Sequence, residues 1–160
     1  MMDKIELKVN NNIYQGFESV RVNKSMQSIA HTFYMEIFKG DEVKITNNDL
    51  LQILVNDKVF LTGYLDDYEI DISDTKKPLS ISGRSKAMDL VDCNIENNKQ
   101  YKNINIVQII TDLISPFDIT VSSSLSLEKI ENFYTKTGET YFDAINRLCK
   151  QTNKIGRAHV

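Results

Sequence analysis

The sequence predicts a mainly β protein with a smaller α+β second part. An antiparallel β-barrel comes first, and an incomplete α/β domain follows it. Short segments with alternating apolar and polar residues recur through the first half of the 160-residue chain. Asn, Asp and Gly residues, which favour turns, separate these segments. After residue 95 the spacing of apolar residues becomes helical. We therefore expect a barrel domain over residues 1–95 and the start of a second domain over residues 96–154.

The alternating segments are typical of strands that bury one face. Ile5, Leu7 and Val9 alternate with polar residues, and three asparagines then form a turn at residues 10–12. Asn56 and Asp57 predict a tight connection of the same kind, and Gly63 is expected to interrupt its strand as a bulge. The expected strands cover residues 3–9, 17–23, 32–38, 51–55, 59–61, 68–72 and 79–81, with one helical turn over 25–30 and a break at Gly40-Asp41.

The stretch GRSKAMDLVDC, residues 83–93, superficially resembles a phosphate loop. A Walker pattern needs a second glycine, separated by four residues from its Gly-Lys pair, and here only one glycine is present. The alternative is a strand end followed by a short helix. We expect that helix to place Ala87, Met88, Leu90 and Val91 on the barrel.

Helical spacing dominates the second part of the chain. Apolar residues from Ile106 to Ile114 form one face of a helix that Ser115-Pro116 should end. Residues 118–123 predict a strand. A second helix should begin near Thr140, because Thr140 and Asp143 have the spacing of a capping box.

Composition argues against several classes of protein. The formal net charge of -3, with no dense basic run, is unlike that of a nucleic-acid-binding protein. The longest apolar run, Leu50 to Val55, is far shorter than the roughly 20 residues that span a bilayer. The first residues also lack the apolar core of a signal peptide, so we expect synthesis in the cytoplasm and no membrane insertion.

No set of residues predicts a catalytic, cofactor or metal site. The only histidines, His31 and His159, do not form metal-binding spacings with the two cysteines, Cys93 and Cys149, which we expect to be buried free thiols. A series of acidic residues is a candidate for catalytic carboxylates or for a calcium site. Strand alternation would instead separate its neighbouring members, and EF-hand spacing is missing, which favours a solvated or interface-facing strand. This series comprises Asp66, Asp67, Glu69, Asp71 and Asp74.

The last six residues, Ile155 to Val160, have an unusual sequence. IGRAHV matches one reading frame of a widely used sequencing adapter, so we expect an artefact here and a natural chain that continues differently after Lys154. The alternative is a genuine short tail.

Several motifs, in this order, are similar to the N-terminal region of the Mu-type phage baseplate hub family, also called the phage tail protein D-like family. They are FESVRVNKSMQSIAHTFYMEI, LVNDKVFLTGYLDDYEIDI and LSISGRSKAMDLVDC. TKTGETYFDAINRLCKQTN, residues 135–153, resembles a helix shared with contractile-injection hubs of the VgrG type. Together these motifs cover most of residues 15–153.

This resemblance implies a structural protein of a phage tail or tail-like machine, with no enzymatic activity. Three copies of the full-length protein would form a ring that joins the tail tube protein to the spike protein. DNA would pass through the ring without specific binding. The protein would be assembled in the host cytoplasm and reside in the tail baseplate of the virion.

The resemblance also indicates structural or interface residues. We expect Arg84 to pair with a carboxylate and Asp89 to cap the short helix. The acidic strand at 64–72 fits a channel lining that repels DNA phosphates. The residues expected to have a structural or interface role are Gly63, Tyr64, Asp66, Asp67, Gly83, Arg84, Asp89 and Leu90.

Two other classes remain as alternatives. A tail-associated peptidoglycan hydrolase would need a pair of acidic residues in a cleft or zinc-binding histidines. A cytoplasmic β-barrel binding module would use a groove for peptides or oligosaccharides.

Overall fold

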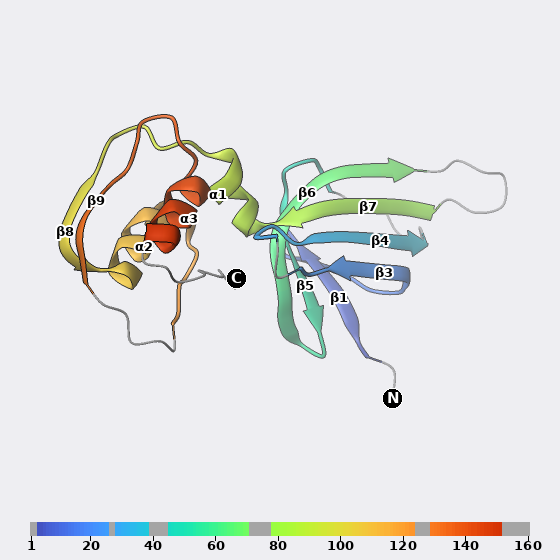
Figure 1. Cartoon of the computed structure of the whole chain (residues 1–160). Helices are drawn as coiled ribbons and strands as arrows, with labels where there is room; N and C mark the ends of the chain where they lie inside the picture. The colour runs from blue at the N-terminus through green and yellow to red at the C-terminus, as the bar shows by residue number, and fades with distance from the viewer. Residues whose placement is uncertain (1–2, 26–27, 39–44, 71–77, 124–128, 152–160) are drawn as a thin grey trace. The chain divides into compact units, whose positions relative to one another are not determined.

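The computed structural model describes residues 3–25, 28–38, 45–70, 78–123 and 129–151 (Figure 1). The chain forms two compact units, Met1–Lys86 and Ala87–Val160. Residues 87–95, which the sequence assigns to the barrel, thus belong to the second unit. The expected break at Gly40-Asp41, the acidic residues Asp71 and Asp74, and residues 155–160 lie outside the described residues, as does part of the expected helical turn at 25–30.

The first unit is one antiparallel sheet of seven strands, curled into a half-barrel, in the order β2-β1-β5-β6-β7-β4-β3. This confirms the mainly β, barrel-like fold class. The strands are β1 (Ile5–Val9), β2 (Asn12–Tyr14), β3 (Phe17–Asn23), β4 (Thr32–Phe38), β5 (Leu50–Val55), β6 (Lys58–Ile70) and β7 (Pro78–Ser85).

The hairpin turns follow from their asparagine and aspartate residues. Asn10 and Asn11 have φ angles of 47° and 67° between β1 and β2, and Asn56 and Asp57 have φ angles of 52° and 64° between β5 and β6. Positive φ at both central residues matches the right-handed twist of the flanking strands, and asparagine and aspartate tolerate it best after glycine. Both predicted turns are confirmed.

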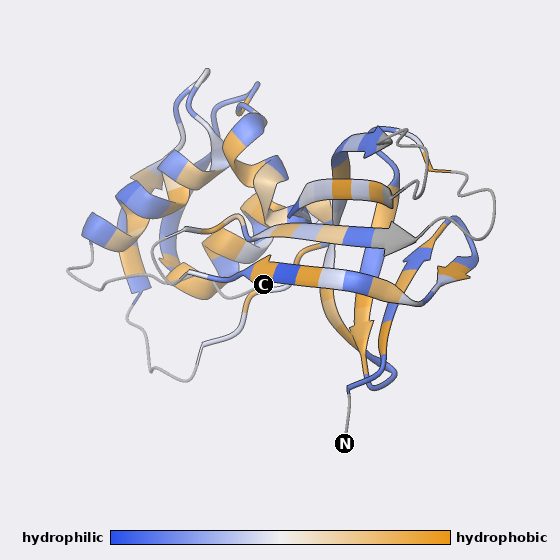
Figure 2. Cartoon of the chain, turned by 90° about the vertical axis from the view of Figure 1, so that its right-hand side faces the viewer, coloured by the Kyte–Doolittle hydropathy of each residue, from blue (hydrophilic) through white to orange (hydrophobic). Residues whose placement is uncertain are grey.

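The core of the first unit consists of the apolar residues that alternation directs to one face. Figure 2 shows the resulting bands of hydrophobic and hydrophilic residues along the strands. Leu7, Met35, Ile53 and Leu65 are completely buried. The rest of this core is Val9, Phe33, Ile45, Leu51, Leu61, Leu79 and Ile81.

Strand β6 is continuous through Gly63, so the expected interruption there is wrong. Its first half pairs with β5 and its second half with β7. The register shifts occur elsewhere, between Ile53 and Leu54 on β5 and between Leu65 and Asp67 on β6.

The second unit combines a two-stranded sheet with helices (Figure 1). A 3-10 turn at Lys86–Met88 leads into α1 (Asp89–Asp92), which is followed by β8 (Gln100–Asn105), α2 (Ile106–Ile114), a 3-10 turn at Ser115–Phe117, β9 (Lys129–Tyr134) and α3 (Tyr141–Gln151). Its buried residues include Leu90, Tyr101, Ile106, Ile109, Leu113, Ile130, Phe133, Ala144, Leu148 and Cys149.

Side-chain caps explain where α2 and α3 begin. The Asn105 side chain accepts a hydrogen bond from the backbone N–H of Val107, and Gln108 completes a capping box. The Thr140 hydroxyl accepts a hydrogen bond of 3.0 Å from the backbone N–H of Asp143. The predicted start of α3 near Thr140 is thus confirmed, and α2 covers the predicted apolar face from Ile106 to Ile114.

Two expectations for the second unit are wrong, namely the strand at 118–123 and the burial of Cys93. Residues 118–123 form no strand, whereas β8 and β9 form strands that the sequence did not predict. Helix α1 packs against α3 within the second unit. Cys93 is exposed, and only Cys149 is the buried thiol expected of both cysteines.

Candidate functional site

Six of the eight sequence-predicted residues lie on two neighbouring strands of the first unit. Gly63, Tyr64, Asp66 and Asp67 belong to β6, and Gly83 and Arg84 belong to β7. Tyr64 pairs with Arg84, and Leu65 pairs with Gly83. We call residues 63–67 and 83–85 the β6–β7 site.

The two glycines of the β6–β7 site allow a close approach of backbones. A Cβ added to Gly63 would collide with the Arg84 carbonyl, and one added to Gly83 would collide with the Tyr64 carbonyl and lie 2.5 Å from Phe33 Cζ. Neither position requires a positive φ. Glycine is therefore needed at both positions because there is no room for a Cβ atom, and not because of the backbone conformation.

The carboxylate partner of Arg84 is Asp66. Arg84 Nε donates to Asp66 Oδ2 at 2.6 Å, and Nη2 donates to Oδ1 at 3.0 Å. These two parallel hydrogen bonds fix the geometry of the ion pair. The Arg84 and Asp66 side chains are 38% and 32% exposed, however, so water screens the interaction between their charges. Asp67, one residue further along, is exposed, and its Oδ1 accepts the backbone N–H of Tyr68.

Ser85 shows how the end of β7 is anchored. Its backbone N–H donates to the His31 carbonyl at 2.8 Å, and its buried hydroxyl accepts the His31 N–H at 3.0 Å. Because the hydroxyl bonds the backbone of His31, this contact holds two chain segments together and does not activate a nucleophile. The spacing of residues in the sequence did not predict this contact between Ser85 and His31.

Asp89 and Leu90 belong to the second unit and do not join the β6–β7 site. Leu90 is 2% exposed and contributes to the core of that unit. Asp89 is the first residue of α1, whose N-cap is Met88, and no side chain caps the helix. Met88 therefore occupies the N-cap position that was expected for Asp89.

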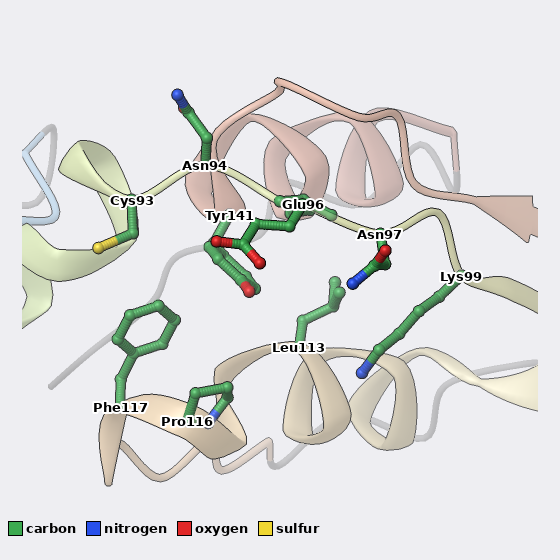
Figure 3. A pocket seen from close by; sticks show the side chains of 10 residues that line it. Cys93, Asn94, Glu96, Asn97, Lys99, Leu113, Pro116, Phe117 and Tyr141 are labelled. Carbon is green, nitrogen blue, oxygen red and sulfur yellow. The ribbon is translucent and has the colours of Figure 1, made fainter.

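The second unit contains a pocket of about 410 Å³ that the sequence did not predict (Figure 3). Residues 93–97 and Lys99 form one wall, with Glu96 extending toward the ring of Tyr141. Leu113, Pro116 and Phe117 lie on the opposite side. The lining thus combines an acidic side chain with apolar and aromatic surfaces.

Backbone hydrogen bonds fix the shape of this pocket. The N–H of Ile95 donates to the Glu139 carbonyl, that of Gly138 to the Ile95 carbonyl, and that of Tyr141 to the Cys93 carbonyl. The rings of Phe117 and Tyr141 meet edge to face with centroids 4.8 Å apart. The aromatic side of the pocket is therefore held in place by packing as well as by backbone bonds.

The charges around the pocket are partly neutralised. Lys99 Nζ lies 2.9 Å from Asp112 Oδ2, which also accepts the Tyr101 hydroxyl hydrogen bond at 2.6 Å. These bonds, first that from Tyr101 and then that from Lys99, lower the pKa of Asp112. Burial and the hydrogen bond to Asp112 raise the pKa of Tyr101. Burial and the negative charges of Asp89 and Asp92 raise the pKa of Cys93.

Neither site has the features of a metal centre or a membrane segment. Within the described residues, no group of three or more His, Cys, Asp or Glu side chains is placed to hold a metal ion. In the same part of the chain, every helix is too short or too polar to cross a bilayer.

Comparison with known proteins divides the chain at the same point as the structure. Residues 4–85 match the N-terminal domain of the Mu phage baseplate assembly protein GpP-like family, and residues 87–155 match the second domain of the baseplate hub protein gp44-like family. Baseplate hub protein gp44 of Escherichia phage Mu is 25% identical over 158 residues, which cover 94% of this chain and 42% of that protein.

Solved structures show the same relationship. The 43 kDa tail protein of prophage MuSo2 from Shewanella oneidensis has a TM-score of 0.83 and 27% identity, over 95% of this chain and 51% of that one. A tail protein from Neisseria meningitidis MC58 shares the fold, with a TM-score of 0.79, 18% identity, and 92% and 45% coverage.

The fold also extends to a component of the Escherichia coli type VI secretion system. Its TM-score is 0.54 at 10% identity, over 92% of this chain and 38% of that one. The chain spans about half the length, or less, of the relatives it matches. With its two domains matched in order, the chain belongs to the Mu-type baseplate hub family, and the relatives it matches include phage and prophage tail proteins.

Proposed function

We propose that the full-length protein forms a homotrimeric ring that links the tail tube protein to the spike protein. The observation that carries this proposal is the open sheet of the first unit. Among the described residues, β2 and β3 each pair with only one strand, so the half-barrel has two edges. Unpaired strand edges favour pairing with another chain, and joining such edges between copies would close a ring.

The surface of the first unit supports this proposal. Several large apolar side chains are at least 44% exposed on the β1–β2 and β5–β6 hairpins and on β6. Such groups are suited to contacts with neighbouring subunits. They are Ile13, Leu50, Val59, Phe60 and Tyr68.

A structural role is also the one that the chemistry of the sites favours. The β6–β7 site contains an ion pair and two close-packed glycines, and Asp67 and Glu69 are exposed beside it. An acidic strand facing a channel would repel DNA phosphates and let DNA pass without specific binding. We therefore infer a virion tail protein without enzymatic activity, assembled in the host cytoplasm.

The test is the mass of the full-length protein, measured by light scattering during size exclusion, alone and with tube and spike proteins. A trimer, or a larger complex that contains the spike protein, supports the ring. A protein that stays monomeric with both partners present contradicts it and favours a binding module instead.

A further inference from the structure

The pocket of the second unit has the size of a side-chain site. Its volume of about 410 Å³ is near the lower end of the range for ligand pockets, about 300–1,000 Å³. One long side chain with its flanking backbone would fill much of it. A dinucleotide or other large cofactor would not fit.

The charge that remains in the pocket is negative. Lys99, the only basic residue of its lining, is neutralised by Asp112 at 2.9 Å. Glu96, in contrast, makes no ion pair or hydrogen bond with any of the residues that the structure describes.

The walls around Glu96 are aromatic. The glutamate side chain extends toward Tyr141, and Phe117 lies across the pocket from it (Figure 3). Aromatic faces attract cations, and a guanidinium group both stacks on such faces and offers a planar fork to a carboxylate. The unit already contains this combination, because Arg147 lies 4.7 Å from the centroid of Phe133 while it binds Glu139.

We propose that this pocket binds an arginine side chain presented by a partner protein. The guanidinium group pairs with the Glu96 carboxylate, and the aliphatic stem packs against Phe117, Tyr141 and Pro116. Charge complementarity selects arginine over neutral and acidic side chains, and the aromatic walls select it over a small cation. The inference does not require the ring, because the pocket lies wholly within residues 93–141.

The experiment uses the isotope-labelled chain and two small probes, N-acetyl-arginine methylamide and its neutral isostere N-acetyl-citrulline methylamide. NMR titration should show that the arginine probe shifts the backbone amides of Glu96, Asn97 and Tyr141. The citrulline probe should bind about fivefold more weakly, because it lacks the charge that pairs with Glu96.

Matched variants test the role of the carboxylate. Glu96→Gln should weaken binding of the arginine probe by about fivefold and bring it close to that of citrulline. The control is Glu131→Gln, an exposed position on β9 outside the pocket, which should leave binding unchanged. Phe117→Leu should also weaken binding, because it keeps apolar contact but removes an aromatic face.

Cys93 provides a second readout in the unmodified protein. It is exposed and lines the pocket, whereas Cys149 is buried, so the arginine probe should slow alkylation of Cys93 alone. Three results would each overturn the proposal: equal binding of both probes, unchanged binding after Glu96→Gln, or shifts that spread over the acidic strand at 66–69 and spare the pocket.

Discussion

Arg84 and Asp66 join β7 to β6 through two hydrogen bonds between one guanidinium and one carboxylate. Asp66 occupies the register shift between Leu65 and Asp67, where β6 carries one more residue than its partner strand. The ion pair thus fixes the orientation of a bulged residue next to the close-packed Gly63 and Gly83.

Replacing Arg84 by lysine should destabilise the first unit slightly. Lysine keeps the charge but cannot donate two parallel hydrogen bonds, and the pair is partly exposed, so the expected loss is about 0.5–1 kcal/mol. Urea unfolding of Arg84→Lys, Asp66→Asn and the double variant gives the coupling energy. If the two single losses simply add, the two side chains do not stabilise each other.

Gly83→Ala should destabilise the first unit far more. The new methyl group would overlap the Tyr64 carbonyl and the Phe33 ring, and overpacking of this kind costs about 1–3 kcal/mol or more. Ser82→Ala, the preceding residue of β7, is the control and should change stability by less than about 0.5 kcal/mol. A thermal melt of Gly83→Ala that matches the unaltered protein would show that the strands can move apart.

The Lys99–Asp112–Tyr101 cluster should make stability depend on pH at both extremes. Because the folded pKa of Asp112 lies below its ordinary value of 3.8, its contribution is complete above that pH and is lost as pH falls through the lowered pKa. The raised pKa of Tyr101 has the opposite effect, and stability should fall as pH rises above the ordinary value of 10.0. The free energy of unfolding should be measured by urea titration across the pH range. Asp112→Asn should reduce its dependence on pH in acid, and Tyr101→Phe should reduce its dependence on pH in alkali. Glu131→Gln should change neither.

Thr140→Ala should cost about 1 kcal/mol, because it leaves the N–H of Asp143 without its cap. Thr140→Ser retains a hydroxyl and should restore most of that loss. Denaturation monitored by helical circular dichroism would test this pair. Equal stability of the alanine and serine variants would mean that the hydroxyl contributes nothing.

Sequence patterns predicted the first unit well because its strands bury one face. A strand can be recognised from its sequence when apolar residues occupy every second position. Strands β1, β4 and β5 each have at least two buried apolar residues with this spacing. The asparagine turns were predicted because few other residues adopt positive φ.

The same reasoning failed where burial is sparse. Within β8, only Tyr101 is buried, and β9 buries only Ile130 and Phe133 at a spacing of three. Neither segment therefore shows alternation. Residues 118–123 do contain apolar residues, but no neighbouring strand pairs with them in the described structure. The Glu96 pocket is assembled from three separate stretches of the chain, so no local pattern predicts it.

The shared strand β6 has a consequence for the order of folding. β5 and β6 are joined by a two-residue turn, whereas β1 reaches β5, and β4 reaches β7, only after long stretches of chain. Local hairpins form in microseconds, and distant pairings must first overcome the entropy of closing a loop. The β5–β6–β7 segment is therefore expected to form the folding nucleus, onto which β1 and β4 add from either side. Substitutions in β6 should slow refolding, whereas those in β2 or β3 should mainly accelerate unfolding.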